Sequence, residues 1–309
     1  MTSEKTPTIT AVIPMHNGLP HIIACINSLK LQECDDFNLR IIVVDDGSTD
    51  NSAGEIGKKF NDIQILSGDG NLWWTGAIAV GTRKALDDDA DYIFWINEDD
   101  TLSDGALQNL LQSLRKNKKG IAGCGVVFDS NSDRIVCGYS LRYFKWYSQA
   151  LYYPRSHFLS PTFVSNCDLN GGHGILIPQT LFTQGKAVIR PAIFPHYFGD
   201  FDFYVQARKL GYKPYIVGGV LVLSAPPRAV VSPASVGLLT GRRIQSRKHI
   251  LPYLFSRKSQ HNLRDRPLFA LLDFPPGLNL IWALLFVMAS FYCVVFFPFR
   301  KKDDIQYLR

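Results

Sequence analysis

Residues 41–48 constrain the fold more than any other segment of the chain. Ile41 to Val44 is a run of four β-branched residues, and Asp45-Asp46-Gly47-Ser48 follows it directly. A continuous apolar run predicts a strand buried on both faces of a parallel sheet. Open α/β sheets bind ligands at the carboxyl ends of such strands, where carboxylates suit base N–H groups or ribose hydroxyls. A turn followed by a helix cap is the alternative interpretation.

The first half of the chain alternates apolar runs with helical patterns. Strands are predicted at residues 8–14, 39–44, 63–66, 92–96 and 120–128, with helices at 19–30, 48–60, 74–86 and 105–117. This alternation predicts a doubly wound, mostly parallel α/β sheet of Rossmann-like type. No G-x-G-x-x-G motif follows the first strand and no P-loop motif occurs, which argues against ordinary NAD-binding and P-loop proteins. The aromatic-rich segment 134–163 is expected to be irregular, with most of its rings used in packing.

Six cysteines are scattered through 309 residues without a C-x-x-C pair or zinc-ligand spacing. This distribution indicates reduced thiols in a cytosolic setting. The first eight residues are polar, so we expect no signal peptide and a catalytic region that faces the cytosol.

Basic and apolar residues gather toward the C-terminus. Residues 225–266 contain nine Lys or Arg and one acid, Asp265, and an uncharged stretch runs from Phe274 to Phe299. Its core, residues 278–297, has the length of roughly 20 residues that spans a bilayer. A full span, a tilted interfacial helix and a buried helix remain open, and basic residues at both ends leave the orientation open. Anionic lipids explain the basic block better than nucleic acid, for which no binding motif is present.

These patterns predict three regions. Residues 1–225 form the main domain, with a nucleotide-binding half at about 8–128 and an acceptor half at about 129–225. Residues 226–273 form a basic, membrane-proximal segment, and residues 274–309 form a hydrophobic membrane-associated helix with a basic tail.

A second acidic cluster, Asn97-Glu98-Asp99-Asp100, follows the strand predicted at 92–96. Mg²⁺ and Mn²⁺ prefer oxygen ligands, usually one or two carboxylates together with substrate phosphates. Because parallel strands end at the same edge of a sheet, we expect this cluster and Asp45-Asp46 to face one crevice. One would hold a nucleoside and the other the metal at its diphosphate. A capped turn before the helix at Gly105 is the alternative.

A third cluster lies at residues 196–203, where Asp200 and Asp202 precede a helical pattern. These carboxylates either cap that helix or supply a general base that takes a proton from an acceptor hydroxyl. Upstream, the glycines of Gly171-Gly172-His173-Gly174 permit close approach of the backbone to a substrate. His173 is expected to be a surface-loop residue rather than a metal ligand.

In their order along residues 8–225, these segments resemble family 2 glycosyltransferases. The resemblance rests on Pro14-x-x-Asn17, Val44 to Asp50, Asn71-Leu72-Trp73-Trp74-Thr75-Gly76, Asn97 to Asp100, Gly171 to Pro178 and Tyr197 to Asp202. The Asn-Leu-Trp-Trp-Thr-Gly and Tyr-Phe-Gly-Asp segments are most similar to the bacterial rhamnosyltransferase-like branch. The resemblance implies a GT-A fold, a nucleotide-sugar donor, a divalent metal and inversion at the anomeric carbon.

The resemblance also implies roles for residues on the donor side. Asp46, together with Asp45, matches the residues that contact the base and ribose, and Pro14 and Asn17 match the loop beside the nucleotide. The nucleotide-sugar set is completed by Asn71, Trp73 and Trp74.

Around the reacting centre, Asn97-Glu98-Asp99 occupies the D-x-D position, with Asp99 as the main carboxylate for Mg²⁺ or Mn²⁺ and Asn97 as a neutral ligand. Asp200 matches the catalytic base. Gly172, His173 and Asp202 are expected on the acceptor side.

Four positions depart from the family pattern. Asn97 replaces an Asp, which weakens the expected metal site, and Gly199 stands where many relatives carry an acid before the base. Ala79 replaces an expected Asn, and Gln206 replaces an Arg that often follows the base. The last two put donor contacts in doubt.

We therefore expect an inverting, metal-dependent hexosyltransferase on the cytoplasmic face of the bacterial inner membrane. It would move sugar from a UDP- or dTDP-linked donor to a lipid-linked or polysaccharide acceptor, and a homodimer is a further expectation. The alternatives are a catalytically degenerate nucleotide-sugar-binding protein and a nucleotidyltransferase. The latter usually carries a basic, glycine-rich loop after its first strand, which residues 14–20 lack.

Overall fold

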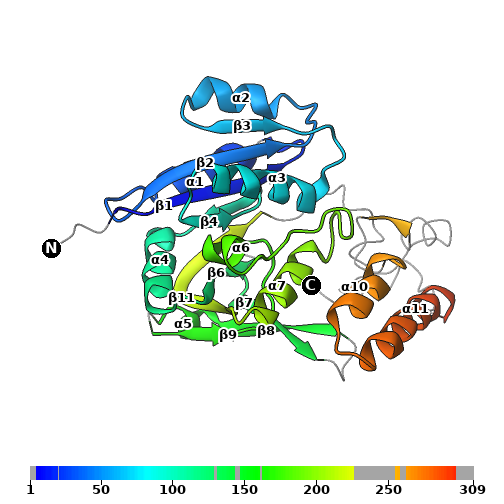
Figure 1. Cartoon of the computed structure of the whole chain (residues 1–309). Coiled ribbons are helices and arrows are strands. Elements are labelled where there is room, and N and C mark those ends of the chain that lie inside the picture. Colours follow the sequence, from blue (N-terminus) through cyan, green and yellow to red (C-terminus); the bar gives the residue numbers. More distant parts are fainter. Residues whose placement is uncertain are drawn as a thin grey trace. The chain divides into compact units, whose positions relative to one another are not determined.

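The buried parallel strands predicted from the N-terminal apolar runs are present. The computed structural model describes residues 5–19, 21–128, 131–142, 147–160, 162–225, 255–257 and 262–296. It contains two units, Met1–Pro226 and Pro227–Arg309. In the first unit, β1 (Thr8–Met15), β2 (Asn38–Asp45), β3 (Gln64–Ser67) and β4 (Tyr92–Trp95) form the parallel series β3-β2-β1-β4. Figure 1 shows these strands side by side, with α2 (Ser52–Lys59) beyond β3.

Helices cover both faces of this parallel series. Ile13 and Val43 belong to the core on the side of α1 (His21–Lys30). On the other face, Val12 and Val44 lie under α3 (Trp73–Asp87), so close that a Cβ on Gly81 would come within 2.3 Å of Val12 Cγ1. Burying a branched aliphatic side chain contributes about 1.5–3 kcal/mol relative to leaving it exposed. Two-sided burial therefore explains why these strands are continuous apolar runs.

The middle of the sheet contains a reversed strand. β10 (Ile175–Pro178) lies antiparallel between β4 and β6 (Gly120–Val127), and β11 (Lys213–Ser224) pairs with β6 in parallel. α4 (Ala106–Lys116) connects the segment after β4 to β6, as expected from the sequence. The reversal places the glycine loop that precedes β10 at the same edge as the carboxyl ends of β4 and β6. The mostly parallel, mixed α/β architecture is thus confirmed.

The segment expected to be irregular instead contains a hairpin. β7 (Arg134–Arg142) pairs antiparallel with β8 (Tyr147–Pro154), and the register shifts between Val136 and Tyr139, where Gly138 has a φ of +79°. This shift interrupts the two-residue alternation that marks a strand in sequence, which explains the wrong prediction. Tyr139 and Tyr153 pack on other rings, as expected. Tyr143, Phe144 and Trp146 lie outside the described residues.

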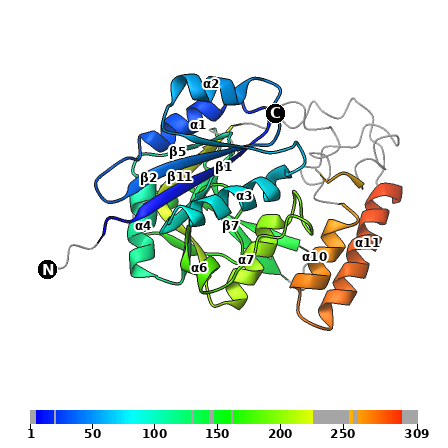
Figure 2. The same cartoon turned by 45° about the horizontal axis from the view of Figure 1, so that its top comes forward.

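Shorter elements complete the first unit, of which Figure 1 labels β9 and α5 and Figure 2 labels β5. β5 (Asp100–Leu102) and β9 (Val164–Asn166) each pair antiparallel with β11. The remaining helices are α5 (Arg155–Phe158), α6 (Thr180–Thr183) and α7 (Gly199–Lys209).

In the second unit, α10 (Asp265–Asp273) and α11 (Leu278–Phe296) form a helical hairpin. Ala270 of α10 clusters with Trp282, Ala283 and Phe286 of α11, whereas the large apolar residues Leu280, Ile281, Leu284 and Met288 are 55–69% exposed. Over the part of the chain that the structure describes, no helix is both long and apolar enough to cross a membrane. Of the three alternatives left open by the sequence, a full span is therefore not supported, and one face of the apolar helix packs against α10. Most of the basic block lies outside the described residues.

Candidate functional site

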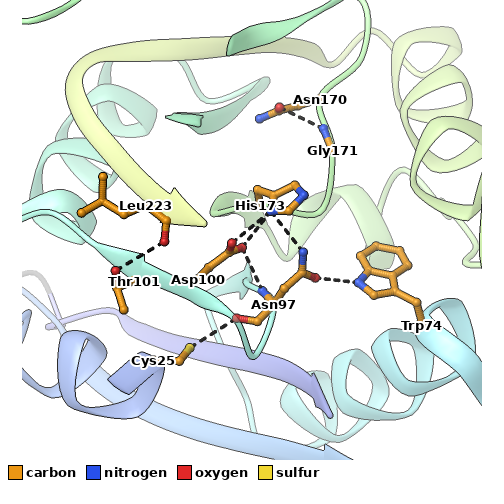
Figure 3. A network of polar contacts seen from close by, with 9 residues as sticks. All are labelled: Cys25, Trp74, Asn97, Asp100, Thr101, Asn170, Gly171, His173 and Leu223. Atoms are coloured by element: carbon orange, nitrogen blue, oxygen red, sulfur yellow. Dashed lines mark hydrogen bonds and ion pairs between the residues drawn. The ribbon is translucent and has the colours of Figure 1, made fainter. Parts of the chain in front are cut away.

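Four side chains from three separate segments meet beyond the end of β4. The indole Nε1 of Trp74 donates to Asn97 Oδ1 at 2.8 Å, and Asn97 Nδ2 lies 3.2 Å from His173 Nδ1. His173 Nδ1 also lies 2.9 Å from Oδ2 of the fully buried Asp100. Figure 3 shows His173 between Asp100 and Asn97, with Trp74 on the far side of Asn97. The network ties the start of α3, the loop after β4 and the glycine loop before β10.

His173 forms an ion pair with Asp100. Desolvation opposes its protonation, but the charge and hydrogen bond of Asp100, with smaller effects of Asp99 and Asp200, raise the pKa of His173 to about 9. The imidazole is consequently protonated at neutral pH. Its Nδ1–H donates to the Asp100 carboxylate, because the other neighbour, Asn97 Nδ2, is itself a donor. His173 is thus a partly buried cation, and the expectation of a simple surface-loop residue was wrong.

Asp99 has the environment of a carboxylate that favours a bound cation. Desolvation first, and the neighbouring Asp100 charge second, raise its pKa. A divalent ion would relieve both effects, and one carboxylate together with substrate phosphates is an ordinary Mg²⁺ site. No group of three His, Cys, Asp or Glu side chains suited to a metal is found within the described segments. The environment of the Asp99 carboxylate itself fits a cation that also binds substrate phosphates.

Asn97 does not offer an uncommitted carbonyl to such a metal. Its Oδ1 accepts the Trp74 indole hydrogen bond, and its backbone N–H donates to Asp100 Oδ2 at 3.3 Å. Its backbone oxygen also accepts a weak hydrogen bond from Cys25 Sγ, at 3.4 Å. The role of Asn97 as a metal ligand stays a prediction, while its bonds to the surrounding segments are structural facts.

Asp200 lies in the first turn of α7. Its Oδ1 accepts from the backbone N–H of Phe201 at 2.9 Å, and Phe198, at the N-cap, has the left-handed φ of 68°. Desolvation raises the pKa of Asp200 to about 6, although the Phe201 hydrogen bond and the charge of His173 oppose the shift. A carboxylate with a pKa near 6 is a stronger base than an ordinary one, yet it is ionised at neutral pH.

The carboxylates of the two aspartates after β2 accept backbone hydrogen bonds from nearby loops. Asp46 is buried, and its carboxylate accepts three backbone hydrogen bonds: Oδ1 from Gly70 at 2.9 Å and Leu72 at 3.1 Å, and Oδ2 from Trp73 at 2.8 Å. It thereby holds the loop that begins α3. Asp45 is half-buried and accepts from the Ser48 backbone N–H through Oδ1 at 3.0 Å. The alternative interpretation of this motif, a turn, therefore accounts for part of its structure.

The loop after β1 is fastened to the same turn. Asn17, with a φ of 57°, accepts from the Thr49 backbone N–H at 2.7 Å, and its own N–H donates to Ser48 Oγ at 2.8 Å. Asp50 accepts from the Leu19 backbone N–H at 3.0 Å. Pro14 is buried within β1, so any contact with a nucleotide would come from its neighbours.

Asn71 and Trp73 lie where the Asp46-bound loop meets α3. Asn71 is exposed, and its backbone N–H donates to Asp69 Oδ1 at 2.9 Å. Trp73 has a φ of 57°, a backbone conformation that bulky residues rarely adopt, and its ring lies 6.0 Å from that of His196. Strain of this kind persists when surrounding contacts fix it, as the Asp46 carboxylate does here.

Two glycines make room for side chains of α3. A Cβ on Gly172 would lie 2.2 Å from Trp74 Cζ2, and one on Gly199 would lie 2.1 Å from Thr75 Oγ1. Gly199, which departs from the family pattern, is thus the residue that lets Thr75 pack at the start of α7. Thr75 also joins α3 to the segment before the base, because its N–H donates to Pro195 O at 3.0 Å.

Asp202 is occupied by a structural ion pair. It is completely buried, and Arg190 binds it with two nitrogens, Nε at 2.9 Å and Nη2 to the other oxygen. Gln206 Nε2 also donates to Asp202, at 3.0 Å, and to Val188 O. Arg190 and Gln206, the residue that stands in place of the expected Arg, thus bind the same buried carboxylate. Nothing in the structure accounts for Ala79.

Several site residues were not predicted from the sequence. Asp100 was recognised only as part of a cluster, and neither Thr75 nor Arg190 stood out, since their partners lie 12 to 124 residues away. Asp50 had a usable signal, because an Asp two residues before Ser52 at the start of a helix favours a local cap.

Comparisons with known proteins agree with this geometry. The model of glycosyl transferase family 2 matches residues 10–167. The uncharacterized glycosyltransferase EpsJ of Bacillus subtilis is 33% identical over 131 residues, 41% of this chain and 36% of EpsJ. Glycosyltransferase GlyG of Streptococcus pneumoniae is 30% identical over 112 residues, 35% of each chain. The match thus spans about a third of these curated relatives.

Solved structures share the fold. GalNAc-T7, solved with UDP, GalNAc and Mn²⁺, superposes with a TM-score of 0.58 at 15% identity, covering 72% of this chain and 44% of its own. Staphylococcus aureus TarS 1–349 in complex with UDP gives 0.55 at 14% identity, covering 93% and 90%. The family model covers more than half of the residues, from β1 into the segment before β10. The chain belongs to glycosyl transferase family 2.

Proposed function

We propose that this glycosyltransferase is an inverting, metal-dependent hexosyltransferase of the rhamnosyltransferase-like branch. It would move a sugar from a UDP- or dTDP-linked donor to a lipid-linked or polysaccharide acceptor in bacterial surface glycan assembly. The observation that carries the proposal is Asp200, a carboxylate with a pKa of about 6 within electrostatic reach of the His173–Asp100 pair. Relatives of the same fold solved with UDP support the donor class.

In the proposed reaction the acceptor hydroxyl oxygen attacks the anomeric carbon on the face opposite the diphosphate. The bond from that carbon to the diphosphate oxygen breaks, and its electrons leave with the nucleotide. Asp200 takes the hydroxyl proton as the new bond forms. Attack and departure on opposite faces give inversion.

Asp99 would hold the divalent ion, Mg²⁺ or Mn²⁺, and the ion when bound supplies positive charge to the departing diphosphate. Asp45, whose carboxylate is only partly used by the Ser48 turn, would contact the nucleoside. Asp46 would act mainly by holding the loop that carries Trp73 and Trp74.

For the site of action we propose the cytoplasmic face of the bacterial inner membrane. The exposed apolar face of α11 supports an interfacial position, and charge supports it as well. Residues 227–309 contain thirteen Lys or Arg against four Asp or Glu, a net charge of +9, whereas residues 1–226 have −3. A basic unit with an exposed apolar helix face suits an anionic lipid surface.

The donor site is tested by the melting temperature of the full chain with UDP, dTDP, GDP or CMP, each with and without Mn²⁺. A ligand at 100 times its Kd stabilises a fold by about 2.7 kcal/mol. We expect a metal-dependent shift with UDP or dTDP, and no shift with any of them would contradict the donor assignment. Asp200→Asn should keep the shift and lose turnover, whereas a binding protein would have no turnover to lose.

Membrane docking is tested separately by flotation with vesicles of mixed anionic and neutral lipids. Leu280→Asp combined with Leu284→Asp should release the protein from the vesicles, while Leu31→Asp, on an exposed site of the first unit, should not. Equal flotation of all three proteins would reject the interfacial role of α11.

A further inference from the structure

Phe128 is an exposed aromatic residue beside the network of Trp74, Asn97, His173 and Asp100. It directly follows β6, and 44% of its surface is accessible. Its ring centroid lies 5.4 Å from that of His173, and the two planes are nearly perpendicular, at 87°. In an edge-to-face pair of this kind the imidazole covers at most one face of the phenyl ring.

The order of the strands places Phe128 away from the nucleotide loops. The sheet runs β3-β2-β1-β4-β10-β6, and the residues assigned to the nucleotide follow β1, β2 and β3. Phe128 follows β6, on the opposite side of β4. His173 lies between, since it pairs with Asp100 and contacts Asn97 next to β4. With the donor assigned to the loops after β1, β2 and β3, Phe128 borders the side of the site that is left for an acceptor.

The electrostatic surroundings also connect Phe128 with the base. His173, its ring partner, is influenced by the charge of Asp200, and Asp200 in turn by that of His173. An exposed apolar ring thus lies against the histidine that contacts Asn97 and Asp100. Single exposed apolar residues are common at protein surfaces, so location and not exposure alone is the informative feature.

A pyranose ring has the matching chemistry. One of its faces can present several C–H groups with weak positive charge, and the face of an aromatic ring is electron-rich. Stacking the two removes apolar area from water while the sugar hydroxyls stay available for polar partners. A base that deprotonates a sugar hydroxyl needs that sugar held in one orientation, which a flat aromatic surface at its side provides.

We propose that Phe128 is a specificity-determining residue whose free ring face stacks on the pyranose of a saccharide acceptor. This inference rests on the proposed function, because it takes the occupant to be the acceptor of sugar transfer. It goes further because it states that the part of the acceptor bound next to Asp200 is a sugar ring.

The test uses the full chain with UDP and Mn²⁺ bound, and methyl glycosides of glucose, galactose, N-acetylglucosamine and rhamnose as probes. Saturation-transfer NMR should show at least one glycoside bound, with the strongest signals on the C–H groups of one ring face. Phe128→Ala should weaken the binding of that glycoside roughly tenfold, and Phe128→Trp should retain its binding. The melting shift produced by UDP and Mn²⁺ should be equal in all three proteins.

Leu31→Ala is the matched control, because Leu31 is 76% exposed and directly follows α1, which contributes no side chain to the proposed acceptor contact. It should leave glycoside binding unchanged. Equal glycoside affinity in the wild type and Phe128→Ala would overturn the proposal, as would failure of every glycoside to bind the UDP-loaded protein. A reduced UDP shift in Phe128→Ala would place the ring at the donor and also overturn it. Failure of UDP to bind the wild type would instead contradict the proposed function.

Discussion

Thr75 occupies the space that a side chain at Gly199 would need. A Cβ there would lie 2.1 Å from Thr75 Oγ1, far inside contact distance. Because Gly199 directly precedes Asp200, the side chain of α3 determines which residue can stand next to the proposed base. The absence of an acid at position 199 is therefore a packing requirement of this chain.

Gly199→Ala should lower the free energy of unfolding by about 1–3 kcal/mol, the usual cost of overpacking a buried site. Urea unfolding measures the change. Gly199→Ala combined with Thr75→Ala should recover part of the loss, since the closest remaining contact is with Thr75 Cβ at 3.0 Å. A Gly199→Ala protein as stable as the wild type would show that the contact is easily relieved.

Gly172→Ala should disturb the site more than the fold. The new methyl group would meet the Trp74 indole at 2.2 Å and displace it from its hydrogen bond with Asn97. We expect kcat/KM to fall by one to two orders of magnitude, in line with the cost of small displacements at reacting centres. Gly57→Ala, where nothing lies within 4 Å, is the control and should keep full activity.

Asp200 should make turnover depend on pH. Its pKa in the folded protein is about 6, so as a base it becomes active as pH rises through 6. The same shift, from an ordinary value of 3.8, means that the folded state binds more protons than the unfolded chain between about pH 4 and 6. The contribution of Asp200 to stability therefore decreases over that interval as pH rises.

Asp200→Asn should accordingly abolish turnover and raise the free energy of unfolding at pH 7.5 by on the order of 1–3 kcal/mol, with less effect at pH 4. Melting curves at both pH values measure this. Asp202→Asn should behave in the opposite way and destabilise the protein, because it disrupts the buried pair with Arg190. If Asp200→Asn destabilised the protein at pH 7.5, burial of the charged Asp200 carboxylate would not cost stability, contrary to its raised pKa.

The His173–Asp100 pair should contribute stability mainly below pH 9. Because the pKa of His173 is raised from 6.5 to about 9, its contribution is complete below 6.5 and decreases as pH rises through 9. His173→Gln leaves the buried Asp100 charge without a cation and should cost roughly 3 kcal/mol at pH 7. It should also flatten the pH dependence of the melting temperature between 6.5 and 9.

The matched control is His157→Gln, since the His157 ring contacts Tyr153 and Phe163 rather than a carboxylate. It should leave the pH dependence unchanged. If His173→Gln and His157→Gln gave the same pH profile, the ion pair would not control stability in this range.

Substitutions of the two aspartates after β2 should affect different properties, stability for Asp46 and UDP binding for Asp45. Asp46→Asn turns an amide toward backbone N–H donors and should cost about 1–3 kcal/mol of stability. Asp45→Asn keeps an oxygen for the Ser48 N–H and should change stability little, while weakening UDP binding at least tenfold. Urea unfolding and titration with UDP and Mn²⁺ distinguish them. Equal UDP affinity in Asp45→Asn would remove Asp45 from the nucleotide site.

The sequence predicted those features that depend on neighbouring residues. Strands buried on both faces must be continuous apolar runs, so β1, β2, β4 and β6 were recognisable, and the acidic residues after them follow directly in the chain. The side-chain partners were not predictable. Nothing local pairs His173 with Asp100, 73 residues earlier, or Arg190 with the buried Asp202.

The reversed strand β10 also has a consequence for how the protein is made. Its pairing partners, β4 and β6, are synthesised at residues 92–95 and 120–127, whereas β10 ends at Pro178. Until the ribosome has released that residue, β4 and β6 face each other across a missing strand with unpaired backbone groups. Exposed strand edges of this kind invite pairing with other chains. The nascent protein thus exposes these two strand edges at mid-length, and a strand of four residues closes the gap between them.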